Sequence, residues 1–167
     1  MVEQIILKPF SEDNIERTYD FIQDKNFRYL FMMNGEPVWD NHLNYFHKIL
    51  NDPNQKVFAI YLNNTHIGNC GFKYIKPNEE AELWVYIGSI EHKGKGYGYL
   101  ACKELINFGL KELNLKFIVL HVAKYNDIAQ NLYKKLGFKF VDLDNNTKEI
   151  WGEKSESLLK MKINRGN

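Results

Sequence analysis

The chain has 167 residues, of which 44% are hydrophobic and 26% charged, and 22 Lys and Arg against 21 Asp and Glu leave a formal charge of +1. This length suits one domain with a sizeable core, so residues 1–167 are expected to form a single domain. The balanced composition excludes a disordered chain and offers no basic surface for nucleic acid, and two cysteines without a CxxC spacing exclude a disulfide scaffold and a zinc ribbon.

The first half of the chain predicts helices followed by strands. Ser11 can cap a helix that carries Ile15, Tyr19 and Ile22 on one face. Turn residues at 63–64 and 77–78 separate three alternating segments, which predicts an antiparallel meander. The expected elements are, in order, a strand at 2–8, helices from about 11 and about 40, and strands at 56–62, 65–75 and 80–87.

The second half predicts helices alternating with strands. Helical spacing of apolar residues runs over 96–113, and the apolar segment 116–122 is typical of a strand covered on both faces. A helix at 126–136 ends at Gly137, which suits a left-handed cap. Strands at 138–142 and 157–163 follow, joined by a polar loop. This order predicts an α/β fold with helices on a mixed sheet.

A glycine-rich turn, residues 93–98 (KGKGYG), lies between the strand at 80–87 and the helix that follows. Glycines let several backbone N–H groups point at one place, and a helix N-terminus adds partial positive charge. Such a turn can hold a phosphate or pyrophosphate, although it can also be a tight turn without a ligand. The spacing fits neither a dinucleotide fingerprint nor a Walker motif.

Two motifs together resemble the GCN5-related N-acetyltransferases (GNAT): KGKGYGYLACKEL at 93–105 and NDIAQNLYKKLGFKF at 126–140, with one strand between them. The resemblance implies the GNAT fold: a mixed sheet of about seven strands flanked by helices, with two splayed parallel strands at the acetyl-CoA site. The segment AELWVYIGSIEHKGKGYG looks like the branch that contains the ribosomal-protein alanine acetyltransferases.

The resemblance also assigns the residues that bind acetyl-CoA as co-substrate. The pyrophosphate is expected at the glycine turn, whose members are Lys93, Gly94, Lys95, Gly96, Tyr97 and Gly98. Lys93 stands where the family usually has Gln or Arg, which implies an altered phosphate contact. Backbone groups of Tyr86 and Ile87, and the side chain of Asn126, are expected to bind the pantetheine arm; Asn126 can equally be a helix cap.

Acetyl transfer to an amine requires proton transfers, and the resemblance suggests which residues perform them. The departing thiolate needs a proton, and Tyr133 stands where the family commonly keeps a hydroxyl beside the CoA sulfur; without the motif it would read as a core aromatic. Glu82 is the candidate general base, with Glu80 on the same strand face toward the substrate. Both can instead be exposed acids, with a water chain serving as the base.

The acceptor amine has a weaker signal. The region after Phe31 resembles N-acetyltransferases of nucleotide-linked amino sugars, which would place His42 near the acceptor; His42 can equally be a polar residue in a helix's first turn. A protein N-terminus, a polyamine or an aminoglycoside are alternative acceptors, and a non-catalytic acetyl-CoA sensor is a further alternative. The aromatic run Phe27, Tyr29, Phe31 is typical of core but could stack on a substrate ring.

The remaining expectations concern location and partners. No apolar run reaches membrane-spanning length and the N-terminus lacks an export pattern, so a cytoplasmic protein is expected, with no membrane or nucleic-acid partner. The spacing of His42 and His47 and the absence of HExxH predict no metal site. The resemblance allows a homodimer through Trp151 and the strand at 157–163.

Overall fold

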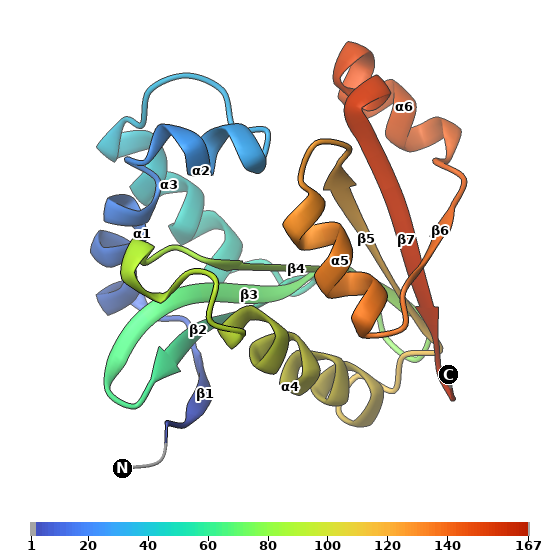
Figure 1. Cartoon of the computed structure of the whole chain (residues 1–167), viewed down its shortest axis with the longest axis horizontal. Coiled ribbons are helices and arrows are strands. Elements are labelled where there is room, and N and C mark those ends of the chain that lie inside the picture. Colours follow the sequence, from blue (N-terminus) through green and yellow to red (C-terminus); the bar gives the residue numbers. More distant parts are fainter. Residues whose placement is uncertain (1–2, 167) are drawn as a thin grey trace.

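The computed structural model describes residues 3–166 and is built on one seven-stranded mixed sheet (Figure 1). The strand order is β1-β2-β3-β4-β5-β7-β6, and every neighbouring pair is antiparallel except β4 and β5. The strands are β1 (Ile5–Pro9), β2 (Lys56–Leu62), β3 (Thr65–Lys76), β4 (Glu80–Ile87), β5 (Phe117–Ala123), β6 (Lys139–Val141) and β7 (Leu158–Asn164). The expected α/β fold with a mixed sheet of about seven strands is confirmed.

Helices cover both faces of this sheet (Figure 1). The α-helices are α1 (Ile15–Phe21), α2 (Lys25–Leu30), α3 (Trp39–Leu50), α4 (Tyr97–Lys111), α5 (Asp127–Lys135) and α6 (Asn145–Trp151). Short 3-10 turns occupy Glu12–Asn14, Ile90–His92 and Gly152–Ser157. Because α4 and α5 pack on one face and α1 and α3 on the other, side chains alternate along the central strands between two cores.

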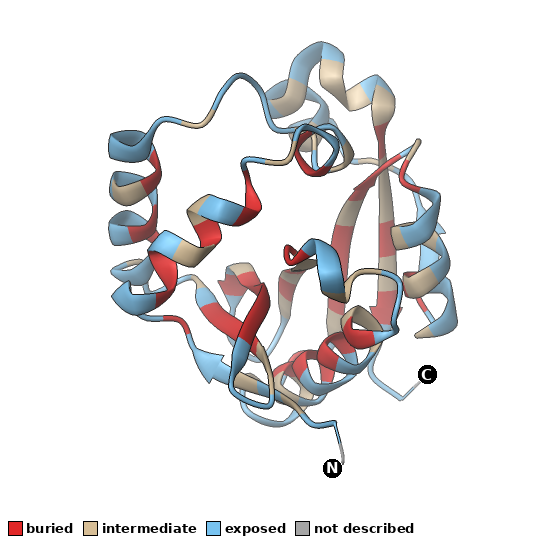
Figure 2. Ribbon diagram, turned by 60° about the vertical axis from the view of Figure 1, so that its left-hand side comes forward, coloured by how far each residue is buried: buried red, intermediate tan, exposed pale blue. Residues whose placement is uncertain are grey.

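The larger core lies between the sheet and α4, where buried residues line the inner side of the helix (Figure 2). Leu105 of α4 and Leu83 and Leu120 of the strands are almost fully buried there. Cys102, expected in the core helix, has no exposed surface, and burial raises the pKa of its thiol to about 12. Both cysteines are buried and free.

The two central parallel strands separate shortly after they meet. Their pairing is limited to Glu80 with Phe117, Ala81 with Ile118 and Glu82 with Val119. Beyond Glu82, the edge of β4 that faces β5 has no ladder partner on β5. A gap therefore opens between the strands toward the carboxyl end of β4, as the expected splayed pair requires.

Two helices differ from the sequence-based expectation. The segment that contains Phe27 forms α2, a two-turn helix capped by Asp24, whose side chain accepts from the N–H of Asn26. Residues 145–151, expected as a loop, form α6, which the side chain of Asp144 caps at Thr147. Both helices are too short to show an amphipathic period, so their side-chain caps are the local signal. Within residues 3–166, no helix has the length and apolarity needed to cross a membrane.

Candidate active site

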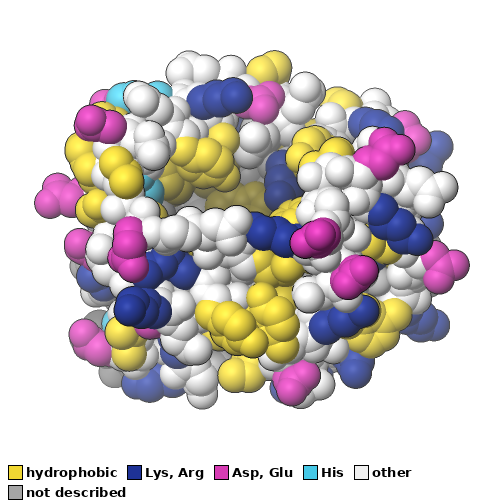
Figure 3. All heavy atoms as spheres, turned by 90° about the horizontal axis from the view of Figure 1, so that it is seen from above, with side chains coloured by type: hydrophobic (Ala, Val, Ile, Leu, Met, Phe, Trp, Pro, Cys, Tyr) yellow, Lys and Arg dark blue, Asp and Glu magenta, His cyan; other side chains and the backbone are white. Residues whose placement is uncertain are grey.

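A cavity of about 460 Å³ lies at the carboxyl end of β4, beyond the point where β4 leaves β5. Its walls come from both faces of the sheet: Tyr133 and Leu132 of α5 lie on one side, and Phe27 and Phe31 of α2 on the other. The lining also includes the carboxyl end of β4, the glycine turn and the first turn of α4. A space-filling view from above shows the surface hollowed, with hydrophobic side chains inside and Lys or Arg at the edge (Figure 3). The cavity is thus lined by helices from opposite faces of the sheet.

The glycine turn forms the anion-binding end of this cavity. Gly94 and Gly96 have φ angles of +73° and +85°, in the left-handed region that favours glycine. Gly96 caps α4, and no side chain caps the helix, so its first N–H groups point toward the cavity end unsatisfied. No atom lies within 4 Å of where a Cβ of Gly94 or Gly96 would be, which leaves open space for a phosphate. Together with Tyr97 and Gly98, both glycines line the cavity.

The two lysines of the turn behave differently. Lys93 lines the cavity, and its Nζ lies 3.5 Å from Oδ2 of Asp24 and 5.3 Å from the centre of the Phe27 ring. Lys93 therefore ties the turn to the start of α2. Lys95 is exposed and is not among the residues that line the cavity.

Tyr133 and Asn126 both reach the cavity from α5 and its cap. Tyr133 is 5% exposed, and its hydroxyl has no hydrogen-bond partner among residues 3–166. Burial raises the pKa of Tyr133, with a smaller contribution from the Cys102 thiol, so the phenol stays protonated at neutral pH. Asn126 caps α5, where its Oδ1 accepts from the N–H of Ala129 at 3.2 Å.

The end of β4 offers both backbone and side-chain groups. Tyr86 and Ile87 line the cavity, beyond the point where β4 leaves β5. The Tyr86 ring packs edge-on against Phe27 and Phe31, and its hydroxyl accepts from Nδ2 of Asn69 at 2.8 Å. Burial raises the pKa of Tyr86. The side chain is therefore fixed, while the backbone edge facing β5 is available to an extended ligand.

Besides Lys95, three candidate residues do not reach the cavity lining. Glu80 pairs with Lys76 at 3.5 Å. Glu82 lies further down β4, with its carboxylate between His121 and Lys73. His42 is buried in α3, where Nε2 lies 2.9 Å from the carbonyl oxygen of Ile15, and it packs among aromatic rings. His42 thus packs inside the fold and does not line the cavity, and its contact with the acceptor stays a prediction.

The buried histidines predict a pH-dependent stability. Burial lowers the pKa of His42 and of His66 below 6.5, and their hydrogen bonds oppose this only in part. The unfolded chain binds these protons near pH 6.5, whereas the folded chain binds them only at lower pH. The free energy of unfolding is therefore complete above about pH 6.5 and falls as the pH drops below it.

Urea unfolding at about pH 7.5 and pH 5.5 measures this effect. His42→Gln keeps a donor for the Ile15 carbonyl but cannot titrate, so this variant is expected to lose less stability between the two pH values than the wild type. An equal loss in both proteins would show that His42 does not contribute.

The wall formed by α2 was not predicted from the sequence. Phe27 is 1% exposed and packs on Tyr86, whereas the neighbouring Tyr29 is 59% exposed. The Tyr29 ring stacks on Tyr125 at 4.4 Å between ring centres, and the Tyr125 hydroxyl donates to the Tyr29 carbonyl at 3.0 Å. This contact joins α2 to the β5–α5 loop beside the cavity. The aromatic run was the available signal, but without the bounds of α2 it could not be placed.

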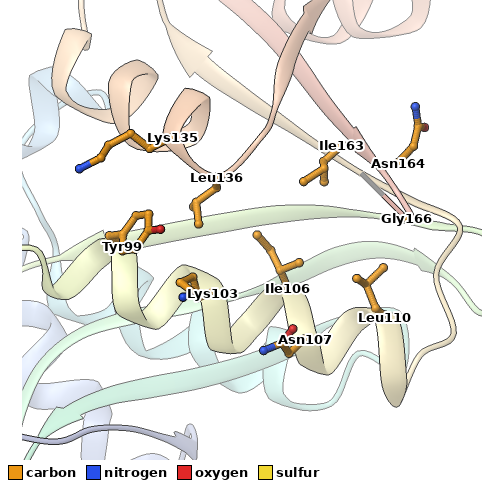
Figure 4. A pocket seen from close by; sticks show the side chains of 10 residues that line it. All are labelled: Tyr99, Lys103, Ile106, Asn107, Leu110, Lys135, Leu136, Ile163, Asn164 and Gly166. Carbon is orange, nitrogen blue, oxygen red and sulfur yellow. The ribbon is translucent and has the colours of Figure 1, made fainter.

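A second, smaller cavity of about 280 Å³ adjoins the first between α4, α5 and β7 (Figure 4). Tyr99 and Lys135 line both cavities. Lys103 and Lys135 each lie near the Tyr99 ring, at 5.7 and 5.4 Å from its centre. Two cationic side chains therefore stand just outside the glycine turn. Among residues 3–166, no group of three or more His, Cys, Asp or Glu is placed to hold a metal ion.

A glycine turn at a helix N-terminus, beside a cavity where two parallel strands separate, has the geometry to hold an extended phosphorylated ligand. The family model of the acetyltransferase (GNAT) domain matches residues 4–139. The chain therefore belongs to the GNAT acetyltransferase family.

Similar proteins agree with this assignment. An uncharacterized N-acetyltransferase, p20, from Bacillus licheniformis is 35% identical over 85 residues, which are 49% of this chain and 47% of that protein. The match thus spans about half the length of the curated relative.

Solved structures share the fold over nearly the whole chain. The spermidine N-acetyltransferase of Vibrio cholerae, in complex with CoA and spermine, has a TM-score of 0.81 at 21% identity, over 97% of this chain and 96% of that one. The Campylobacter jejuni N-acetyltransferase PseH, in complex with acetyl coenzyme A, has a TM-score of 0.70 at 20% identity, over 98% and 100%.

Proposed function

We propose that this chain transfers the acetyl group of acetyl-CoA to a primary amine by direct attack in a ternary complex, and that the amine belongs to a nucleotide-linked amino sugar. The observation that carries the proposal is the cavity at the carboxyl end of β4, whose walls come from α2 on one side and α5 on the other. A cofactor on the α4 and α5 side and an amine on the α2 side can meet there. No covalent acetyl-enzyme is needed when both substrates are bound together.

The cofactor site follows the groups that line the cavity. The pyrophosphate binds the backbone N–H groups of Gly94 to Gly98, where the helix N-terminus favours an anion. The pantetheine arm runs along the free edge of β4 at Tyr86 and Ile87, with Asn126 on the opposite wall. Lys135 and Lys103 stand beyond the turn, on the side where the phosphorylated end of the cofactor leaves the cavity.

The reaction then needs three events at the thioester. The free amine attacks the carbonyl carbon, and N–H groups of the β4 edge stabilise the oxyanion that forms. The C–N bond is made and the C–S bond breaks. The Tyr133 hydroxyl, which is protonated and has no partner of its own, donates its proton to the departing sulfur.

The charge of the cavity bears on the acceptor. No Asp or Glu is among the residues that line it, whereas His92, Lys93 and Lys135 are. A polyamine would need carboxylates for its several positive charges, so this lining disfavours a polycationic acceptor. On the α2 side, the aromatic wall of Phe27 and Phe31 suits a ring, and Lys93, whose Nζ lies 5.3 Å from the centre of the Phe27 ring, suits a phosphate. These features favour a nucleotide-linked amino sugar over a polyamine or an aminoglycoside.

The test is thiol release from acetyl-CoA in the presence of a panel of amines. The panel holds UDP- and dTDP-linked 4-amino sugars, spermidine, an aminoglycoside and peptides with free N-termini, including the N-terminal peptide that the alanine-acetyltransferase branch would take. Turnover with an amino-sugar nucleotide alone is expected. Turnover with another amine would support the proposed acetyl transfer but contradict the proposed acceptor. Intact acetyl-CoA binding with no turnover would contradict the proposed acceptor and favour an amine outside the panel or a sensor.

A further inference from the structure

The side chain of Lys93 crosses from the glycine turn to the α2 wall of the cavity. Its Nζ lies 3.5 Å from Oδ2 of Asp24 and 5.3 Å from the centre of the Phe27 ring, and both of these partners belong to α2 or its cap. The backbone N–H of Lys93 donates to the carbonyl of Ile90 at 3.3 Å. The N–H of Lys93 is thus occupied, and its charge is directed toward α2.

This charge is within reach of a ligand in the cavity. Lys93 lines the cavity, and its side chain is 33% exposed. Phe31, which is 37% exposed and also lines the cavity, packs on the Phe27 ring with 4.8 Å between ring centres. An accessible cation and an accessible aromatic ring therefore both lie beside the buried Phe27, on the α2 side.

The other basic residues that line the cavity face α4. Nζ of Lys135 lies 5.4 Å from the centre of the Tyr99 ring, on α4. The ring of His92 lies 6.2 Å from that of Tyr97, in the first turn of the same helix. Among the basic residues of the described lining, Lys93 is therefore the one that faces α2.

The pair between Lys93 and Asp24 leaves Lys93 able to bind another group. The distance of 3.5 Å exceeds the about 2.8 Å of a strong charged hydrogen bond, and partly exposed pairs of this kind add little to the free energy of unfolding. Oδ1 of Asp24 has a separate role, because it accepts from the N–H of Asn26 at 3.0 Å and caps α2. An ammonium group has three N–H donors, so Nζ keeps free donors beside Asp24.

We propose that Lys93 binds a phosphate of the acceptor, so that it is a specificity-determining residue of the acceptor site, and that Asp24 limits the strength of this contact. This inference rests on the proposed acetyl transfer, in which the amine enters from the α2 side. The phosphate takes the free donors of Nζ, while a ring of the acceptor packs on Phe31. The Asp24 carboxylate repels the same phosphate, because both are negative. The pyrophosphate of acetyl-CoA is then bound by the backbone of the glycine turn, without the Lys93 side chain.

Two substitutions distinguish this role from a structural one, because their expected effects have opposite signs. Lys93→Gln removes the cation, so it should weaken the binding of a phosphorylated ligand by about tenfold to a hundredfold. Asp24→Asn removes the competing charge and keeps an oxygen that can cap α2, so it should strengthen the same binding by about twofold to tenfold. If the pair only held α2 in place, both substitutions would weaken binding.

The first experiment needs no acceptor amine. Calorimetric titration with acetyl-CoA is expected to give the same Kd, to within about twofold, for the wild type and for Lys93→Gln. A Kd raised by about tenfold or more in Lys93→Gln would assign the side chain to the cofactor and overturn the proposal.

The second experiment uses inorganic pyrophosphate as the probe. The protein is first saturated with CoA, so that the glycine turn is already occupied, and pyrophosphate is then titrated by calorimetry. The wild type should bind it, Lys93→Gln more weakly and Asp24→Asn more tightly. The control is Lys8→Gln, which removes a positive charge from above the Tyr61 ring, outside the cavity lining, and should behave as the wild type. No binding to the wild type, or equal binding to Lys93→Gln, would overturn the proposal.

The third experiment measures turnover with the amino-sugar nucleotides of the panel. The KM for the acceptor should rise in Lys93→Gln and fall in Asp24→Asn, while the KM for acetyl-CoA stays unchanged. Lys93→Arg should keep most of the wild-type affinity, because a guanidinium also pairs with phosphate. An acceptor KM that is equal in Lys93→Gln and the wild type would overturn this inference alone.

The failure of the proposed function has a different signature. In that case no amino-sugar nucleotide is acetylated, but pyrophosphate still binds the CoA-saturated protein through Lys93. The phosphate site on the α2 side would then stand, and the proposed acceptor would not.

Discussion

Tyr133→Phe is expected to lower kcat by about a hundredfold or more while leaving the affinity for acetyl-CoA nearly unchanged. The Tyr133 hydroxyl lines the cavity without a partner of its own, so its removal takes away a proton donor and no internal hydrogen bond. The ring remains packed on Phe138, with 5.8 Å between ring centres, and the variant should fold as the wild type does. Thiol release at saturating acetyl-CoA and amine measures the effect.

The choice of acceptor can sharpen this prediction. A more nucleophilic amine depends less on protonation of the leaving sulfur. The loss of rate in Tyr133→Phe should therefore be smaller for a more basic amine. Tyr74→Phe is the matched control, because Tyr74 is 66% exposed and lies on β3 outside the cavity lining. Turnover of Tyr133→Phe equal to that of the wild type would exclude Tyr133 as the proton donor.

Gly94→Ala and Gly96→Ala are expected to weaken acetyl-CoA binding by about tenfold to a hundredfold. Each alanine either holds a left-handed backbone at a cost of about 1–2 kcal/mol or relaxes to a different turn. A relaxed turn no longer aims its N–H groups at the pyrophosphate, and a lost hydrogen bond to a charged group is worth about 1.5–3 kcal/mol. Calorimetric titration with acetyl-CoA measures the loss.

A third glycine separates the cost of backbone strain from the loss of contacts with acetyl-CoA. Gly35, in the α2–α3 loop, has the same φ of +73° as Gly94, and likewise no atom lies within 4 Å of its missing Cβ. Gly35→Ala should therefore lose the same stability as Gly94→Ala but keep the wild-type affinity for acetyl-CoA. Equal losses of affinity in both variants would mean that the glycine turn does not bind the cofactor.

The fold was predictable wherever local chemistry determined it. Asn63 and Asn78 both adopt positive φ at the turns that separate β2, β3 and β4, and the predicted bounds of these strands hold to within one residue. Gly137, with φ of +100°, follows α5 as expected. By contrast, α2 and α6 are stabilised by side-chain caps and by contacts with the rest of the chain. Their sequences have no apolar periodicity that would predict a helix.

The site was predictable where a motif is contiguous and not where it depends on pairing. The glycine turn and Tyr133 lie in continuous segments, so sequence could bring them together as candidates. Glu82 and His121 are far apart in the chain and meet only because β4 and β5 run parallel at that register. His42 shows the same limit for a single residue. Its position in the sequence could not reveal that its ring nitrogen Nε2 lies at hydrogen-bond distance from the Ile15 carbonyl oxygen.

The division of the cavity walls between separate stretches of chain has a consequence for how this protein can change. The glycine turn and Tyr133 lie within residues 93–140, whereas the wall on the opposite face of the sheet comes from α2, before residue 40. On the proposed function, insertions, deletions or recombination before residue 40 can change the acceptor amine without changing the residues that bind acetyl-CoA. Descendants of such a chain would diversify in acceptor much faster than in cofactor, and grafting residues 24–38 between homologues is the most economical route to a new acceptor.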